Sequence, residues 1–370
     1  MKRLAQIVAL VVVTLLTACG NKEVVRSTES IYTPRHAAGF SIERDKASGE
    51  VLLCVRNPWQ GAENICYYYP IDTLSPAKRI VAMSSSHVAM LDAVGCAERI
   101  VGISGCRFIS TPSAVEAIGQ GKIAEVGYDS AFDFEKIRSL RADVVLLYGV
   151  AGEAKTITSK LDELGTPYIY IGDYLENAPL GKAEWVVALA YLCGVEAQGK
   201  EFFAGVEERY NALRNQKHCS AYRPRVMLNL PYRDTWFMPP QNSYMVQLIE
   251  DAGGEYILTE NGKRKTENEN ASKPISLEEA LLLASKADFW INLGQIASLE
   301  ELKSVAPRFA KVDAVHFGRI YNNTKRTNAS RGSDFWESGC IRPDLILADL
   351  VKILHYEAPT DSLYYYTKLQ

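Results

Sequence analysis

The chain has 370 residues, of which 47% are hydrophobic and 23% are charged, and its formal net charge at pH 7 is −3. This composition is ordinary for a globular protein, and the slight negative charge gives no reason to expect a nucleic-acid partner. Because domains usually hold roughly 100–200 residues, a chain of this length has room for two of them.

The first residues have the features of a secretory signal. Lys2 and Arg3 precede an apolar stretch over residues 5–16, which is too short to span a bilayer comfortably. Small residues follow, and after them comes Cys19, the arrangement of a bacterial lipoprotein signal. We therefore predict a signal peptide over 1–18 and lipid on Cys19, with an ordinary signal peptide as the alternative.

The next segments are polar and then strand-like. Residues 19–38 are polar and aperiodic, which predicts a lipidated, flexible tether. Residues 39–75 contain two strand-like arms around a turn-rich stretch, which predicts a small β-hairpin extension. Cys54 and Cys66 flank that turn and could pair in an oxidising compartment or stay separate.

Strands then alternate with helices along most of the chain, which predicts parallel sheets covered by helices. The alternation defines an N-terminal α/β lobe over 76–182 and a C-terminal α/β lobe over 218–370. Linking helices fill 183–217, and a long amphipathic helix over 195–216 would span about 33 Å at 1.5 Å per residue. We therefore predict two Rossmann-like lobes of similar plan on either side of a long helix.

One pattern occurs in both lobes. Glu135 opens a helical stretch that leads to Asp143 and an apolar strand, and Glu278 leads in the same way to Asp288. The spacings differ, at eight and ten residues, so the repeat is structural and not a copied sequence.

Several stretches together resemble one family. They include "RIVAMSSSHVAMLDAVGCAERIVGIS", "FEKIRSLRADVVLL" and "SDFWESGCIRPDLILADLVKILH", in addition to the lipoprotein start. The chain resembles the periplasmic substrate-binding proteins of ABC importers for cobalamin, haem and ferric siderophores, and the resemblance extends from about residue 76 to 369. It implies two α/β lobes joined by a single long rigid helix, with a ligand cleft between the lobes and modest opening. The leading hairpin looks like that of Bacteroides-type lipoproteins of this group.

The resemblance implies that the chain captures an iron chelate (siderophore or haem) or cobalamin and delivers it to the permease. In the family, one glutamate on each lobe docks against arginines of the permease, and the matching positions here are Glu135 and Glu278, with Glu279 as an alternative to Glu278. A glutamate in the first turn of a helix is also favoured by the helix macrodipole alone. The alternative function is a surface or interaction lipoprotein of the same fold without a role in transport.

Loops that follow the strands carry the candidate ligand contacts. Planar, often anionic ligands of this kind favour aromatic walls and a few directed donors. Ser86 could instead cap the helix that follows, for which Ser85 is the other candidate N-cap. Trp336 could simply pack, and His87 could contact the ligand or not. The predicted ligand-binding residues are Ser86, Arg107, Tyr128, Tyr148, Tyr174, Arg233, Trp236, Phe237, Arg331 and Trp336, with Lys325 and Arg326 as further basic candidates.

Other classes of function have less support. The five histidines are scattered, which disfavours a receptor for free metal ions, and no nucleophile elbow, phosphate-binding loop or zinc-protease pattern is present. We therefore expect no catalysis, no bound metal and no cofactor apart from a metal-chelate ligand. The predicted protein is a monomer, lipid-anchored in the bacterial envelope and facing the periplasm.

Overall fold

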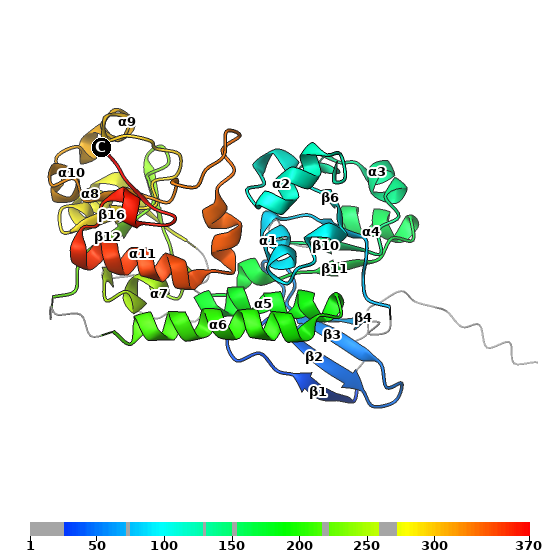
Figure 1. Cartoon of the computed structure of the whole chain (residues 1–370). Coiled ribbons are helices and arrows are strands. Elements are labelled where there is room, and N and C mark those ends of the chain that lie inside the picture. The colour runs from blue at the N-terminus through cyan, green and yellow to red at the C-terminus, as the bar shows by residue number, and fades with distance from the viewer. Residues whose placement is uncertain (1–25, 72–74, 129–130, 150–153, 217–221, 259–271) are drawn as a thin grey trace, which may run out of the picture.

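The computed structural model of the chain describes residues 26–71, 75–128, 131–149, 154–216, 222–258 and 272–370. The predicted signal peptide and Cys19 lie outside the described residues. Two α/β lobes lie side by side, and helices run beneath both of them (Figure 1). Within the part of the chain that is described, no helix is both long and apolar enough to cross a membrane.

The N-terminal lobe is built on a five-stranded parallel sheet. Its order is β11 (Tyr168–Tyr170), β10 (Val144–Leu147), β5 (Ile80–Ala82), β6 (Ile100–Ile103) and β7 (Ala124–Glu125). The central strands are completely buried because apolar residues occupy both of their faces, as covered parallel sheets require. The other elements of this lobe are α1 (Ser85–Ala93), η1 (Ala97–Arg99), η2 (Cys106–Phe108), α2 (Pro112–Gly119), β8 (Gly127–Tyr128), β9 (Ala131–Phe132), α3 (Phe134–Ser139), α4 (Lys155–Glu163) and η3 (Asp173–Leu175).

The C-terminal lobe repeats this plan with one strand reversed. Its sheet has the order β14 (Glu255–Tyr256), β12 (Arg225–Leu228), β16 (Phe289–Ile291), β17 (Ile320–Asn322) and β18 (Thr367–Lys368), and only the edge strand β18 is antiparallel. A separate ribbon pairs β13 (Thr235–Met238) with β15 (Lys273–Ser276). The helices are α7 (Tyr244–Asp251), α8 (Leu277–Ala284), α9 (Leu299–Val305), η4 (Pro307–Phe309), α10 (Asp313–His316), η5 (Asp334–Trp336), η6 (Ser338–Cys340), α11 (Pro343–Tyr356) and η7 (Thr360–Ser362).

The doubled Glu-helix-Asp-strand pattern has the same structural role in both lobes. The carboxylate of Asp143, directly before β10, accepts the backbone N–H groups of Lys78 and Arg79 at 2.8 and 2.9 Å, just before β5. Asp288, directly before β16, accepts the N–H of Arg225 at 2.7 Å, at the start of β12. In each sheet the aspartate thus fixes where the neighbouring strand begins, which confirms that the repeat is structural.

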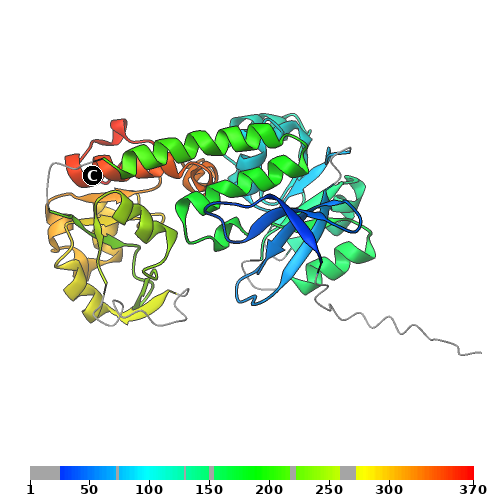
Figure 2. The ribbon, with the colours of Figure 1, turned by 90° about the horizontal axis from the view of Figure 1, so that it is seen from below.

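The link between the lobes is a pair of helices and not one helix. Helix α5 (Pro179–Leu192) is buried along its whole length, because it is apolar on nearly every face. Helix α6 (Glu196–Arg214) packs along α5 and buries one face only. Its 19 residues span about 28 Å at 1.5 Å per residue, and it passes beneath both lobes (Figure 2). The predicted long helix is therefore confirmed, and α5 adds a second, buried layer to it.

The predicted hairpin belongs to a larger sheet. Strands β3 (Val51–Arg56) and β4 (Cys66–Ile71) form the expected hairpin, and β1 (Thr28–Tyr32) and β2 (Phe40–Asp45) extend it into a four-stranded antiparallel sheet. The prediction of a flexible tether is therefore wrong from residue 28 onward. The sequence of β1 is short and polar, and only its pairing with β2 makes it a strand.

Two buried carboxylates attach this N-terminal sheet to the body. Glu184 on α5 accepts the backbone N–H groups of Arg35, His36 and Ala37 at 2.8–2.9 Å and the hydroxyl of Tyr32 at 2.6 Å. Glu176 accepts the N–H of Gly39 and the indole N–H of Trp185 in the same way. A side chain on Gly39 would meet Trp185 at 2.8 Å, so only glycine allows this approach.

Candidate functional site

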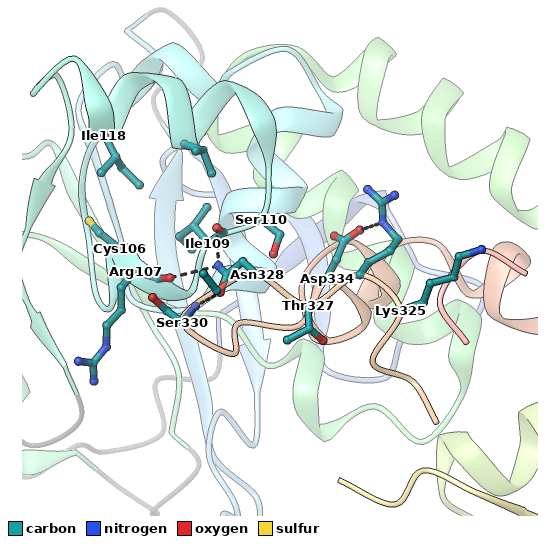
Figure 3. A pocket seen from close by; sticks show the side chains of 13 residues that line it. Cys106, Arg107, Ile109, Ser110, Ile118, Lys325, Thr327, Asn328, Ser330 and Asp334 are labelled. Atoms are coloured by element: carbon teal, nitrogen blue, oxygen red, sulfur yellow. Dashed lines mark hydrogen bonds and ion pairs between the residues drawn. The ribbon is translucent and has the colours of Figure 1, made fainter. Parts of the chain in front are cut away.

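One end of the interface between the lobes holds an open pocket of about 590 Å³. The N-terminal lobe contributes the loop after β6 and helix α2, and the C-terminal lobe contributes the loop after β17 (Figure 3). Both loops follow parallel strands, and ligands of open α/β sheets bind at such positions. The lining includes Cys106, Arg107, Ile109, Ser110, Asn328 and Asp334.

The loop after β6 places a cation among aromatic rings. The guanidinium carbon of Arg107 lies 4.6 Å from the ring centroid of Phe108 and 5.9 Å from that of Tyr128, and the two rings are 5.0 Å apart. Glu125 holds the loop by accepting the N–H groups of Gly105 and Cys106 at 2.9 and 2.7 Å. Tyr128 remains 52% exposed, so Arg107 and Tyr128 present a cation and an aromatic ring on the same surface.

A segment of the C-terminal lobe crosses to this loop. We call residues 325–340 the bridging segment. The side-chain amide of Asn328 donates to the backbone carbonyls of Arg107 and Ile109 at 3.1 and 3.0 Å. A side chain on Gly332 would meet the carbonyl oxygen of Phe108 at 1.9 Å, so the two backbones touch there. Arg331, next to Gly332, is thereby brought to the same end of the interface as Arg107.

The basic residues at this end of the interface divide into two groups. The ammonium of Lys325 donates to the carbonyl of Thr360 at 2.7 Å, and the guanidinium of Arg326 pairs with Asp334 at 2.5 Å, so both have structural roles. Arg107 and Arg331 are exposed, and among the described residues no carboxylate forms an ion pair with either of them. These two arginines are therefore available to an anionic ligand.

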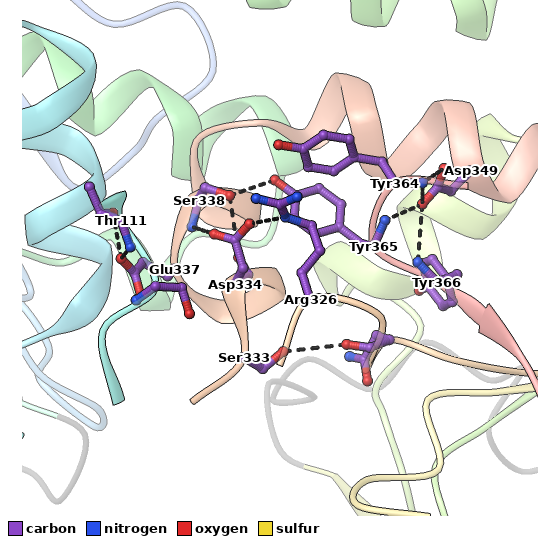
Figure 4. A network of polar contacts seen from close by, with 12 residues as sticks. Thr111, Arg326, Ser333, Asp334, Glu337, Ser338, Asp349, Tyr364, Tyr365 and Tyr366 are labelled. Atoms are coloured by element: carbon purple, nitrogen blue, oxygen red, sulfur yellow. Dashed lines mark hydrogen bonds and ion pairs between the residues drawn. The ribbon is translucent and has the colours of Figure 1, made fainter. Parts of the chain in front are cut away.

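Glu337 joins the two lobes through three hydrogen bonds. It is completely buried and accepts the N–H groups of Ser110 and Thr111 at 2.8 and 2.7 Å, together with the Thr111 hydroxyl (Figure 4). Thr111 immediately precedes α2, so the carboxylate of one lobe caps a helix of the other at its positive end. Burial raises the pKa of Glu337, although its three donors oppose that change.

The raised pKa of Glu337 predicts a measurable pH dependence. The folded protein binds this proton at a pH where an unfolded glutamate, with a usual pKa of 4.5, is already ionised. The free energy of unfolding therefore gains a contribution as the pH falls from neutral toward 4.5, and loses it as the pH rises. We expect the stability difference between wild type and Glu337→Gln to shift in favour of wild type over this range, measured by urea denaturation at several pH values. A difference that stays constant with pH would contradict the assignment, since all other titrating groups are common to both proteins.

In the parallel sheet of the N-terminal lobe, the edge opposite β7 carries a second group of aromatic residues. Tyr148 and Tyr174 follow β10 and β11, and their ring centroids are 6.4 Å apart in an edge-to-face arrangement. Residues 57–62, which lie between β3 and β4 of the four-stranded N-terminal sheet, fold over this edge. There the N–H of Gln60 donates to the carbonyl of Gly149 at 3.3 Å. A cavity of about 530 Å³ lies between them, lined by Trp59 and Tyr174 among others. Sequence reasoning missed Trp59, because no local pattern indicates where the hairpin turn packs.

Two of the predicted contacts, and His87 whose role was left open, are buried in the interior. Trp236 is fully buried, donates its indole N–H to the carbonyl of Leu228 at 3.0 Å and packs against Trp290, so it does not line a cleft. Ser86 is also buried, and its hydroxyl lies 3.0 Å from that of Ser84, the residue that caps α1 in place of Ser85 or Ser86. Burial lowers the pKa of His87 to about 3, so this histidine is a neutral core residue.

The remaining candidates lie on the surface of the C-terminal lobe. The guanidinium carbon of Arg233 lies 5.3 Å from the ring centroid of Tyr232, and Phe237 on β13 is 45% exposed. Trp336 in the bridging segment is 51% exposed and makes an edge contact with Phe335. No described contact joins Arg233 or Phe237 to the group around Arg107.

Both predicted docking glutamates are exposed in the first turn of a helix. Glu135 lies in α3, which is capped by Asp133, and Glu278 lies in α8, which is capped by Ser276. The two helices belong to different lobes at opposite ends of the molecule (Figure 1). Glu278 also pairs with Arg308 at 3.0 Å, but such an exposed pair contributes little to stability and can exchange for another cation.

The lining residues suit an organic ligand better than a bare metal ion. Within the described ranges, no group of three or more histidine, cysteine, aspartate or glutamate side chains could hold a metal. The interface instead offers arginines and aromatic rings.

Comparison with known proteins agrees with the fold and the lobe arrangement. The family model described as "Periplasmic binding protein" matches residues 80–327. The chain belongs to the periplasmic binding protein family, so the predicted class of two-lobed substrate-binding proteins is confirmed.

Individual relatives share only a small part of this sequence, with identities between 17% and 29% for the three described here. An uncharacterized lipoprotein of Methanocaldococcus jannaschii is 29% identical over 294 residues, which cover 76% of this chain and 66% of that relative, slightly less than two thirds of its length. A periplasmic heme binding protein from Pseudomonas aeruginosa superimposes with a TM-score of 0.59 at 17% identity, over 80% of this chain and 98% of that chain. A periplasmic vitamin B12 binding protein of Vibrio cholerae gives a TM-score of 0.52 at 18% identity, over 75% of this chain and 97% of that chain. At these identities the structural likeness is one of fold.

Proposed function

We propose that this protein is the substrate-binding component of an ABC importer, and that it captures a metal chelate of the ferric siderophore, haem or cobalamin type. The observation that carries the proposal is the placement of the exposed Arg107 against the rings of Phe108 and Tyr128, with the exposed Arg331 at the same end of the interface. Arginine binds carboxylates and other anionic oxygens through paired hydrogen bonds, and the rings offer flat apolar surface to a planar ligand.

We further propose how the protein is anchored and which partners it binds. Lipid on Cys19 anchors the chain in the bacterial envelope, facing the periplasm, and the protein acts as a monomer without catalytic activity. Its partners are the chelate and the permease subunits, and the chelate is its cargo. The periplasmic heme binding and vitamin B12 binding proteins of the same fold support this class of ligand.

The direct test is a binding titration of the soluble form followed by tryptophan fluorescence. Trp336 is 51% exposed in the bridging segment, so a ligand between the lobes is expected to change its emission. Cyanocobalamin, haemin, a ferric enterobactin-type chelate and ferrichrome are the ligands to offer, with correction for their absorbance. Saturation by one of them below 1 µM, an affinity of roughly −8 kcal/mol, would support a receptor. A folded protein that binds none of them would favour the interaction lipoprotein without a transport role.

A variant at Arg107 tests the proposed ligand contact. We expect Arg107→Ala to weaken binding of an anionic chelate about 10–100-fold, because one charge-assisted hydrogen bond contributes roughly 1.5–3 kcal/mol. Arg138→Ala on the exposed surface of α3 is the matched control, since it removes the same charge away from the pocket. Equal effects of the two substitutions would mean that net charge, and not this site, determines affinity.

A further inference from the structure

Two cysteines stand at the base of the turn between β3 and β4. Cys54 lies in β3 and Cys66 is the first residue of β4, so the turn of residues 57–65 lies between them. Their sulfur atoms are 2.7 Å apart. The bond of a disulfide is about 2 Å long, so the two sulfurs need little further movement to bond. The sequence alone left open whether these cysteines pair.

The strand register places both side chains on one face of the four-stranded N-terminal sheet. Cys54 pairs with Tyr68, and Cys66 pairs with Arg56, across the antiparallel strands β3 and β4. Because side chains alternate between the two faces of a strand, residues in successive pairs of this kind point to the same side, and the two cysteines are diagonal neighbours. The pairing of the strands therefore holds the sulfurs near one another.

The two thiols differ in their access to solvent. Cys54 is buried at 0% exposure, whereas Cys66 is exposed on the edge strand of the sheet. Burial, together with the hydrogen bond to Cys66, raises the pKa of Cys54 to about 12, so this thiol is protonated in the reduced protein. A disulfide donor in solution therefore reaches Cys66 first, and Cys54 lies close enough to complete the bond.

We propose that Cys54 and Cys66 form a disulfide that closes the base of this turn. The reaction is a thiol–disulfide exchange with the disulfide of an oxidoreductase or of oxidised glutathione. The Cys66 thiolate attacks the donor disulfide and releases one donor thiol. Cys54 then loses its proton to solvent and attacks the Cys66 sulfur of the mixed disulfide, which releases the second donor thiol and leaves the bond. The two electrons pass to the donor, which ends as two thiols.

The bond fixes a turn that covers part of the N-terminal lobe. Trp59 in this turn is 8% exposed, and its ring centroid lies 5.5 Å from that of Tyr170 on β11. Two hydrogen bonds close the turn, from the N–H of Asn57 to the carbonyl of Ile65 at 2.8 Å and from the N–H of Ile65 to the side-chain oxygen of Asn57 at 3.1 Å. The disulfide adds a covalent closure to these bonds, so Trp59 stays over the parallel sheet.

The first test is a map of the cysteines in the full chain without its signal peptide, purified in folded form and treated with oxidised and reduced glutathione. The sample is quenched with acid, alkylated with N-ethylmaleimide under denaturing conditions and digested with trypsin without reduction. Trypsin cleaves after Arg56, so the peptides that hold the two cysteines, residues 47–56 and 57–78, stay joined only through a disulfide. We expect this joined pair. Alkylation of both cysteines, or glutathione retained on Cys66, would overturn the proposal.

Two other cysteines serve as the internal control of the map. The sulfurs of Cys106 and Cys340 lie 3.7 and 3.1 Å from the backbone carbonyl oxygens of Ile103 and Trp336. Both cysteines should carry N-ethylmaleimide in the same digest, which would show that the treatment does not oxidise thiols at random.

Hydrogen exchange tests whether the bond holds the turn. The N–H of Gln60 donates to the carbonyl of Gly149 at 3.3 Å, so its exchange reports opening of the turn. We expect reduction by dithiothreitol to raise this exchange rate roughly 10-fold, because the bond removes conformational freedom from a loop of about 13 residues. Cys66→Ser, at an exposed position, should exchange at the reduced rate with or without dithiothreitol, whereas Cys106→Ser should respond as wild type does. Equal exchange in oxidised wild type and Cys66→Ser would overturn this role of the bond.

Discussion

Simultaneous replacement of Glu135 and Glu278 by alanine is expected to abolish uptake of the ligand by cells while leaving ligand affinity unchanged. The two carboxylates are exposed and lie in different lobes, which the α5–α6 pair and the bridging segment join. A pair of distant anions fixes the orientation of a docked protein, because both have to meet cationic partners at the same time. Since neither residue lines a pocket between the lobes, binding of the chelate should not change. Uptake of radiolabelled ligand and the fluorescence titration together measure both quantities.

The controls address charge and position. Glu163→Ala with Glu300→Ala removes the same total charge from exposed helix positions on α4 and α9, and should leave uptake intact. Glu135→Ala with Glu279→Ala distinguishes the two neighbouring glutamates at the start of α8. Full uptake by the Glu135, Glu278 variant would refute the docking role and favour an interaction protein of the same fold.

Glu337→Ala is expected to lower the free energy of unfolding by about 2–4 kcal/mol. The substitution leaves the N–H groups of Ser110 and Thr111 buried without an acceptor, and each such group costs roughly 1–3 kcal/mol. Because these donors belong to the other lobe, the loss should also loosen the lobes relative to one another. Urea denaturation gives the stability, and hydrogen exchange at the amides of Ser110 and Thr111 reports the local contact.

Two further variants keep this prediction testable. Thr111→Val removes only the hydroxyl donor and should cost about 1 kcal/mol. Glu337→Gln retains the shape and one acceptor, so it should fold even if the alanine variant does not. Unchanged protection of the Ser110 and Thr111 amides in Glu337→Ala would mean that the lobes are held together elsewhere.

The sequence predicted the fold well where the physical signal is local. Apolar strands such as Val144–Leu147 and the amphipathic helix over 196–214 follow from periodicity alone, and the order of strands and helices then fixes the two lobes. The tether over 19–38 was predicted poorly, because β1 depends on pairing with β2 and on the buried carboxylates of Glu184 and Glu176. Those contacts join residues more than 130 positions apart and have no local signature.

The site was predicted less completely for a related reason. Arg107, Tyr128 and Arg331 were identified from loops that follow strands, and the structure brings Arg107 and Tyr128 into contact. Ser86 also follows a strand, yet it is buried, because a position after a strand does not determine which way the side chain points. Trp236 was expected in a loop, but it lies within β13 and is buried. Glu337, which accepts three hydrogen bonds from the other lobe, has a sequence context like that of any other acidic residue near a helix.

The bridging segment has a consequence for how the lobes can move. It joins the lobes near the loops after β6, and the α5–α6 pair joins them along their base. Two attachments leave a pair of rigid bodies essentially one rotational degree of freedom, about the line that passes through both. Rotation about that axis displaces most the far edge of the parallel sheet in the N-terminal lobe, where Tyr148 and Tyr174 lie beside Trp59.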